Sequence, residues 1–230
     1  MTTPAPQGRG FHITLDGRTL RTPARAALNL PTHALALAVA AEWEWQDART
    51  IRPFTMPLMA LCSTAVDRVP VTRGVTISQL LRFFETDALL VRSDKPQLAV
   101  AQSRSWDPIL VWAETEFGVR PVASPSLFGP SQPAGMVHAL TRALARADDW
   151  QLAGITAASA AARSLLMAFA LARGRVRPAD APALLRVEED YQTAEWGFVE
   201  GGHDIDAADL RARCAAAAVF LDLLREETRS

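Results

Sequence analysis

Carboxylates and an imidazole gather near the carboxyl end of the chain, within the stretch EEDYQTAEWGFVEGGHDID. The ionisable residues of interest are Glu188, Glu189, Glu200, His203, Asp204 and Asp206. Carboxylate oxygens and imidazole nitrogens can share a divalent metal ion or exchange protons with a substrate. A metal-dependent hydrolase or oxidase is therefore one interpretation of this cluster.

The spacing within the cluster argues against a metal site. Glu200-x-x-His203 has the spacing that di-iron bundles use on a helix, but its two inner residues are Gly201 and Gly202. Adjacent glycines disfavour an intact helix, and no second Glu-x-x-His is present to complete the ligand set. The glycines instead predict a break between two helices, with Asp204 or Asp206 capping the second one. We expect no metal and no other cofactor.

Motifs of the common enzyme classes are missing from the sequence. It contains no GxxxxGK[ST], GxGxxG, GxSxG or HExxH, and its four histidines are scattered along the chain. These local motifs are therefore ruled out, and a lone histidine is usually structural.

Composition narrows the classes of partner. The chain has 230 residues, of which 49% are hydrophobic and 21% charged, with 24 basic residues balanced by 25 acidic ones. A nucleic-acid-binding protein would usually carry a basic excess, so nucleic acid is not an expected partner. The longest strongly apolar run, Leu165 to Ala172, is too short to span a bilayer, so we expect no membrane insertion. Cys62 and Cys214 lie far apart without CxxC companions, which predicts reduced, buried thiols.

Local signals place one β-hairpin before a series of helices. FHITL, then Asp16-Gly17, then RTLRT predict two short strands around a two-residue turn, after a loose Pro/Gly-rich lead. Short strands are also expected at Ala88–Arg92 and Val119–Ala123, and the proline-rich segment 119–133 is expected to be a loop. The helices are predicted at 32–48, 57–69, 76–86, 104–117, 134–148, 150–172, 179–198 and 206–226.

Apolar periodicity indicates how three of these helices pack. One apolar stripe runs along the last helix, and another lies near residue 190. The stretch Ala157–Ala172 is instead apolar nearly all round, which predicts that it forms the centre of a bundle. The stripe on the last helix comprises Leu210, Cys214, Ala217, Leu221 and Leu224. The stripe near residue 190 comprises Leu184, Val187, Tyr191, Ala194 and Phe198. Glu188, Gln192 and Glu195 form a polar row beside this second stripe. Tyr191 and Phe198 are therefore expected to pack in the bundle, while the acidic side chains face outward.

Tryptophans offer a second signal. Trp43 follows Leu35 and Val39 at spacings of eight and four, which favours packing in the core. The alternative is contact with a partner protein, because Trp is enriched at binding hot spots.

Several strings occur together that are typical of one family. They are LDGRTLRTPARAALNLP, AVAAEWEWQ, IRPFTMPLMALCSTAVD, TDALLVR, QSRSWDPILVW, RSLLMAFALA and EEDYQTAEWGFVEGGHDID. In this order, and over about residues 10–224, they resemble the assembly-chaperone family of the mitochondrial ATP synthase, in the branch dedicated to the alpha subunit of the catalytic head. The VEGGHD form is similar to plant and algal members. One departure is MTTPAPQGRG, which replaces the short strand that usually precedes LDGR.

The resemblance implies an α+β fold with two domains. These are a small β-containing N-terminal domain, assigned to residues 1–54, and a larger, mainly α-helical orthogonal bundle at residues 55–230. It implies a monomeric chaperone, not an enzyme, that binds the unassembled alpha subunit, shields its beta-facing surface and releases it during assembly. The mitochondrial matrix is the implied location, with the bacterial cytoplasm as the alternative.

The family's motifs map onto individual positions of this sequence. The family's EW tryptophan corresponds to Trp43. Its acidic EExxQxxxWG helix corresponds to Glu188, Glu189, Gln192, Trp196 and Gly197, and its HD step to His203 and Asp204. The candidate partner-binding residues come from this acidic helix, from the HD step and from the segment between them. They are Glu188, Glu189, Gln192, Trp196, Glu200, His203 and Asp204. A permanent structural scaffold remains a further alternative to the chaperone.

Overall fold

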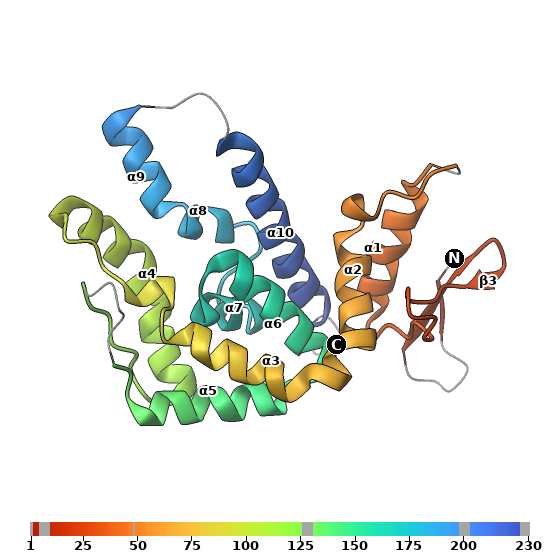
Figure 1. The fold of residues 1–230 in the computed structure, drawn as a ribbon, viewed down its shortest axis with the longest axis horizontal. Coiled ribbons are helices and arrows are strands. Elements are labelled where there is room, and N and C mark those ends of the chain that lie inside the picture. Colours follow the sequence, from red (N-terminus) through yellow and green to blue (C-terminus); the bar gives the residue numbers. More distant parts are fainter. Residues whose placement is uncertain (1, 5–9, 48, 126–130, 198–202, 226–230) are drawn as a thin grey trace.

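The computed structural model describes residues 2–4, 10–47, 49–125, 131–197 and 203–225, and shows an α+β fold with a small sheet beside a helical bundle (Figure 1). The strands are β1 (Thr2–Pro4), β2 (Phe11–Leu15) and β3 (Arg18–Thr19). The α-helices are α1 (His33–Glu44), α2 (Pro57–Ser63), α3 (Val69–Phe84), α4 (Pro96–Phe117), α5 (Ala134–Arg146), α6 (Asp149–Ala162), α7 (Leu165–Ala172), α8 (Ala181–Leu185), α9 (Val187–Trp196) and α10 (His203–Leu223). Shorter helical turns are η1 (Pro53–Thr55), η2 (Thr64–Arg68) and η3 (Ala88–Leu90). No helix in the described ranges is long and apolar enough to cross a membrane.

The sheet is antiparallel and has the order β1-β2-β3. The predicted hairpin is confirmed: Asp16 and Gly17 both have positive φ angles, of 48° and 77°, which suit a two-residue turn between β2 and β3. The expectation of a loose N-terminal lead is wrong for Thr2–Pro4, because Thr2 pairs with Ile13 and Pro4 with Phe11. These residues supply the edge strand that the sequence motifs did not reveal.

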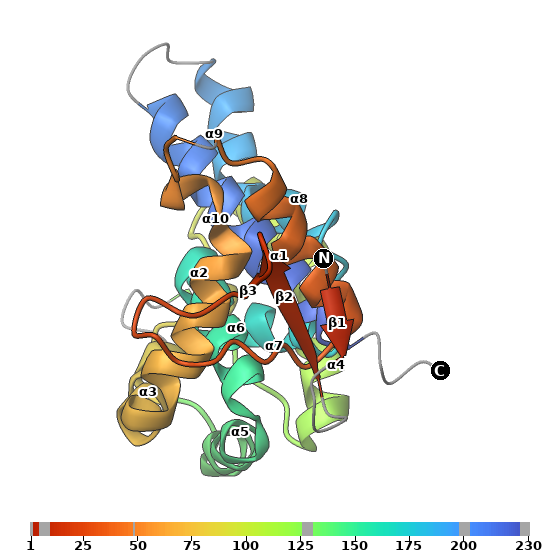
Figure 2. The same cartoon turned by 90° about the vertical axis from the view of Figure 1, so that its right-hand side faces the viewer.

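A small core joins the sheet to α1 and α2, and Figure 2 shows the strands lying beside α1. It comprises Ile13, Leu28, Leu30, Leu35, Ala36, Val39, Met56, Leu58, Met59, Cys62 and Phe220. Phe220 comes from α10, near the other end of the chain. The side chain of Thr32 accepts a hydrogen bond from Leu35 N and donates one to Leu223 O, at 3.1 and 2.9 Å. The domain boundary between residues 54 and 55 stays a prediction.

A larger core surrounds α6 and α7, which α3, α4 and α10 pack against (Figure 1). Burial of the stretch Ala157–Ala172 confirms its predicted central place, since every residue from Leu165 to Leu171 is buried. The prediction of one helix over 150–172 is wrong. Arg163 adopts a left-handed φ of 52°, and the Ser164 hydroxyl caps α7 by accepting from Met167 N at 2.9 Å. Cys62 and Cys214 are buried free thiols, as predicted.

Other predicted boundaries are also corrected. Helix α3 begins at Val69 rather than 76, because Pro70 fits the first turn of a helix, where its missing N–H leaves no bond unmade. Helix α4 likewise begins at Pro96 rather than 104. The expected strands at Ala88–Arg92 and Val119–Ala123 are not strands; a single parallel bridge joins Val91 to Ser124.

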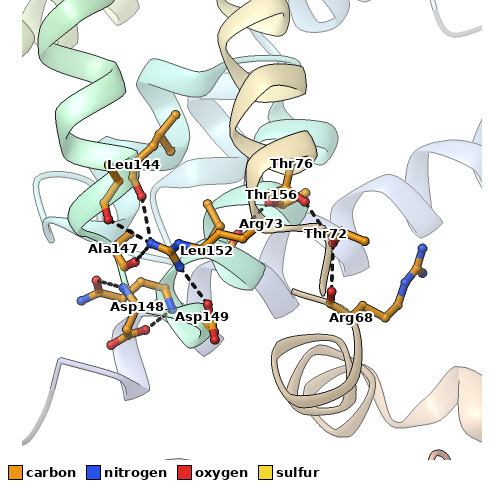
Figure 3. A network of polar contacts seen from close by, with 12 residues as sticks. Arg68, Thr72, Arg73, Thr76, Leu144, Ala147, Asp148, Asp149, Leu152 and Thr156 are labelled. Atoms are coloured by element: carbon orange, nitrogen blue, oxygen red, sulfur yellow. Dashed lines mark hydrogen bonds and ion pairs between the residues drawn. The ribbon is translucent and has the colours of Figure 1, made fainter. Parts of the chain in front are cut away.

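Two buried or half-buried charged groups tie the bundle together. The Arg73 guanidinium of α3 lies at the turn between α5 and α6, where it donates to Asp149 Oδ1 at 2.8 Å and to the carbonyls of Leu144, Ala145 and Ala147 (Figure 3). These carbonyls lie at the negative end of α5, which a cation stabilises. The turn itself carries a capping box made by Asp148 and Gln151.

Asp87 is the second of these charged groups. Its fully buried carboxylate accepts from Leu89 N and from Leu166 N, both at 3.0 Å, so it joins η3 to the start of α7. Burial away from water raises the pKa of Asp87 from 3.8 to about 6, although hydrogen bonds from Ser164 and from backbone N–H groups oppose the increase.

Candidate partner-binding surface

Helix α9 carries most of the predicted site residues that the structure describes, and it lies away from the centre of the bundle (Figure 1). The predicted helix over 179–198 is broken at Arg186 into α8 and α9. The predicted apolar stripe packs only at its start. Leu184 and Val187 contact the large core, but Tyr191 is half-buried and Ala194 is exposed. Phe198 lies outside the described residues, so its predicted packing role stays a prediction.

Glu188 is bound to α4 rather than directed only to solvent. Gln102 of α4, which is almost completely buried, donates through Nε2 to Glu188 Oε1 at 2.7 Å. The amide oxygen of Gln102 accepts from Ser93 N at 2.8 Å, which fixes the orientation of the amide group. Glu188 therefore helps to position α9, in addition to its predicted place on a binding surface.

A second contact between α4 and α9 lies at the other end of α9. Lys95 Nζ is 3.2 Å from Glu195 Oε2 and 4.5 Å from the centre of the Trp196 ring. Ammonium groups are attracted to the face of an indole ring at this range. The Trp196 side chain is nevertheless 65% exposed, so most of its apolar area remains available to a partner.

Arg186 neutralises part of the acidic first turn of α9. Its guanidinium lies 3.5 Å from Glu189 Oε2 and 3.2 Å from Asp190 Oδ1. Acids in a first turn also interact favourably with the positive end of the helix dipole. Glu189 and Gln192 stay exposed, so both side chains can reach a bound protein.

The remaining predicted residues lie around the start of α10. Glu200 lies outside the described residues, and so do the side chains of His203 and Asp204. The backbone places His203 as the first residue of α10. The expectation that Asp204 or Asp206 caps this helix is wrong, because both residues lie within the helix. Among the side chains that the structure describes, no group of three or more His, Cys, Asp or Glu could hold a metal ion.

Trp43 is half-buried and packs against the small core from α1. Its indole Nε1 is buried and finds no hydrogen-bond partner in the described part of the chain. Trp106, in contrast, donates to Leu184 O at 2.8 Å, as expected for a buried indole.

Sequence reasoning missed an exposed apolar group two residues after Trp43. Trp45, Ile51 and Phe54 are 86%, 55% and 82% exposed, at the connection between α1 and α2. A signal was available, since residues two apart on a helix point in widely different directions and Trp43 already faced the core. Lys95 and Gln102, which support α9, carried no comparable signal because their contacts join distant parts of the sequence.

Comparisons with known proteins all point to one family. A family model described as ATP12 chaperone protein matches residues 2–114. The mitochondrial protein atp12 of Schizosaccharomyces pombe is 27% identical over 220 residues, covering 90% of this chain and 76% of the relative. Protein ATP12, mitochondrial, of Saccharomyces cerevisiae is 25% identical over 252 residues, covering 90% and 77%. The crystal structure of Atp12 from Paracoccus denitrificans has a TM-score of 0.87 and 31% identity, covering 98% of this chain and 95% of that chain. The chain therefore belongs to the ATP12 chaperone family.

Proposed function

We propose that this protein is an assembly chaperone that binds the unassembled alpha subunit of the ATP synthase catalytic head. The observation that supports it most is the likeness to Atp12 of Paracoccus denitrificans over 98% of the chain. The matched family is described as a chaperone, which favours a binding protein without enzymatic activity. The comparisons give no support to a metal-dependent hydrolase or oxidase.

The physical need for such a protein follows from its client. A subunit that normally pairs with another exposes its interface when it is alone, and a large exposed apolar interface promotes aggregation. A chaperone that covers the beta-facing surface of the alpha subunit prevents this, and must dissociate when the beta subunit arrives. Reversible binding of this kind requires no catalytic group.

Helix α9 and the start of α10 supply the proposed contact surface. Glu189, Gln192 and Trp196 are exposed along α9, and Lys95 and Gln102 of the α4 region hold the helix in place. Charges at the edge of an interface mainly set orientation and association rate, while an exposed indole contributes contact area. The surface therefore suits a client that presents basic side chains around an apolar patch.

A pull-down from the source cells tests the proposed function. The expected result is recovery of the alpha subunit without the beta subunit, because the chaperone occupies the surface where beta would bind. Recovery of neither subunit would refute the proposal. A permanent scaffold would instead be found in the finished ATP synthase, where we expect this protein to be absent.

Charge reversal tests the surface separately. Glu189→Lys combined with Asp204→Lys is expected to slow capture of purified alpha subunit without unfolding the protein. Glu85→Lys is the matched control, since Glu85 is an exposed carboxylate at the end of α3. Equal capture by the double variant and the control would exclude this surface as the contact.

Location and oligomeric state complete the proposal. The two yeast relatives are named as mitochondrial proteins, which supports a mitochondrial location. Within the mitochondrion we propose the matrix. The Paracoccus relative keeps the bacterial cytoplasm as the alternative. Immunolocalisation in the source organism distinguishes these, and light scattering is expected to show a monomer.

A further inference from the structure

The connection between α1 and α2 presents an unusual amount of apolar surface to solvent. We name its described residues, 45–47 and 49–55, the tip. Trp45 has the largest exposed fraction of any large hydrophobic side chain in the described chain, 86%, and Phe54 follows with Val71 at 82%. Scattered single exposed side chains are ordinary, but Trp45, Ile51 and Phe54 come from one connection of twelve residues, 45–56, and include two large aromatic rings.

Hydrogen bonds from one side chain fix the shape of the tip. Gln46 Nε2 donates to Glu42 O and to Thr55 Oγ1, both at 3.0 Å, and Gln46 Oε1 accepts from Arg52 N at 2.8 Å. Thr55 Oγ1 in turn donates to Arg52 O at 2.8 Å. The two sides of the connection are therefore linked before any partner binds, which lowers the entropy lost on binding.

The tip is also anchored to the small core beneath it. Met56, which follows the tip directly, is buried, and Glu42 accepts from Leu58 N and Met59 N at 2.8 Å each. Trp43 packs inward from α1, and exposed Trp45 directly follows the last residue of that helix. Core packing and hydrogen bonds therefore fix the backbone that carries the exposed aromatic side chains.

Two arginines accompany the apolar side chains. Arg49 and Arg52 are exposed, and neither guanidinium has an acidic partner among the described residues. Asp47 accepts from Arg49 N at 3.0 Å, which engages its carboxylate within the turn. Exposed Glu44 directly precedes the tip and offsets part of its positive charge. Trp and Arg are the residue types that dominate binding hot spots.

We propose that the tip is a second contact point for the client subunit. Trp45, Ile51 and Phe54 enter an apolar depression on the unassembled subunit, and Arg49 and Arg52 meet carboxylates around that depression. The tip and α9 both project from the upper side of the molecule in the two views (Figures 1 and 2). In Figure 1 they stand at opposite ends of its long axis with α10 between them, so a client that spans this side can contact both. The client end that faces α9 then carries basic groups, and the end that faces the tip carries acidic ones. The inference rests on the proposed chaperone function.

The test is binding of purified, isolated alpha subunit to the full chain and to its variants. Trp45→Ala combined with Phe54→Ala is expected to raise the Kd at least about tenfold, as hot-spot aromatics do. Val71→Ala is the matched control, because Val71 is equally exposed but lies on α3, and it is expected to keep the Kd within about twofold. Arg49→Glu combined with Arg52→Glu is expected to slow association at low salt and to have less effect at high salt.

Each outcome decides between the two proposals. If wild-type protein binds the alpha subunit and the aromatic variant binds equally well, the tip is excluded as a contact and the chaperone function stands. If the wild type binds no alpha subunit, both proposals fail. If the aromatic variant instead loses self-association and still binds the client, the tip is a contact between two copies of this chain and the client assignment is wrong. The charge-reversal variant decides the matter if the aromatic variant does not fold.

Discussion

Arg73 offers a test of how the helical bundle is held together. Replacing it by methionine keeps the apolar stem but removes the guanidinium, which contacts Asp149 and three carbonyls at the end of α5 (Figure 3). The lost interaction with the helix dipole costs about 0.3–1 kcal/mol. The half-exposed ion pair with Asp149 adds about 0–1 kcal/mol. The carbonyl of buried Ala147 is left without its donor, which costs about 1–3 kcal/mol.

These contributions predict that Arg73→Met lowers the free energy of unfolding by about 3 kcal/mol. For a chain of this size, that corresponds to a fall in Tm of roughly 6–12 °C. Arg73→Lys keeps the charge but not the planar group of donors, so about half of the loss is expected. Urea denaturation followed by far-UV circular dichroism gives the unfolding free energies, and a thermal scan gives Tm.

Arg68→Met is the control for Arg73→Met. Arg68 is exposed one turn before Arg73, and its side chain points away from the α5–α6 turn in Figure 3. Its replacement is expected to change the unfolding free energy by less than about 0.5 kcal/mol. If Arg73→Met is no more destabilising than Arg68→Met, the reasoning from the carbonyl contacts is wrong.

Three further predictions concern buried or bridging polar groups. Glu42→Ala removes the acceptor for two N–H groups at the start of α2 and is expected to cost about 2 kcal/mol in urea denaturation, whereas Glu42→Gln keeps one acceptor and costs about half as much. Because folding raises the pKa of Asp87 from 3.8 to about 6, the folded state holds this proton more tightly, so stability falls as pH rises from about 4 to about 6. Urea titrations at both pH values should show a difference of about 2 kcal/mol that Asp87→Asn lacks, and an equal pH dependence in the variant would contradict the assignment. Gln46→Ala is expected to leave Tm nearly unchanged but to speed tryptic cleavage after Arg49, and an unchanged cleavage rate would show that Gln46 does not order the tip.

Much of the fold could be predicted from local sequence signals. Asp16-Gly17 determined the hairpin turn because both residues accept positive φ angles. The apolar stretch 157–172 identified the central helices because no face of it is polar. The family could be identified because its motifs occur in one order over nearly the whole chain.

The errors arose where the structure depends on distant contacts or on unusual backbone angles. Arg163 takes a left-handed conformation that its residue type rarely adopts, so the break before Ser164 had no strong local signal. The Gln102–Glu188 hydrogen bond joins residues 86 positions apart, and periodicity cannot reveal such a pair. The apolar stripe on α9 was overestimated because a periodic pattern shows which residues share a face and not whether another helix covers that face.

Phe220 in the small core has a consequence for how the protein is made. Chains emerge from the ribosome amino end first, so the hairpin, α1 and α2 are synthesised long before α10. Until Phe220 arrives and Leu223 accepts from Thr32, the small core lacks this fully buried aromatic side chain. A nascent chain stalled before α10 would therefore expose the same kind of surface that the finished protein is proposed to cover on its client. Before α10 is synthesised, this chaperone therefore exposes apolar surface of its own that favours aggregation.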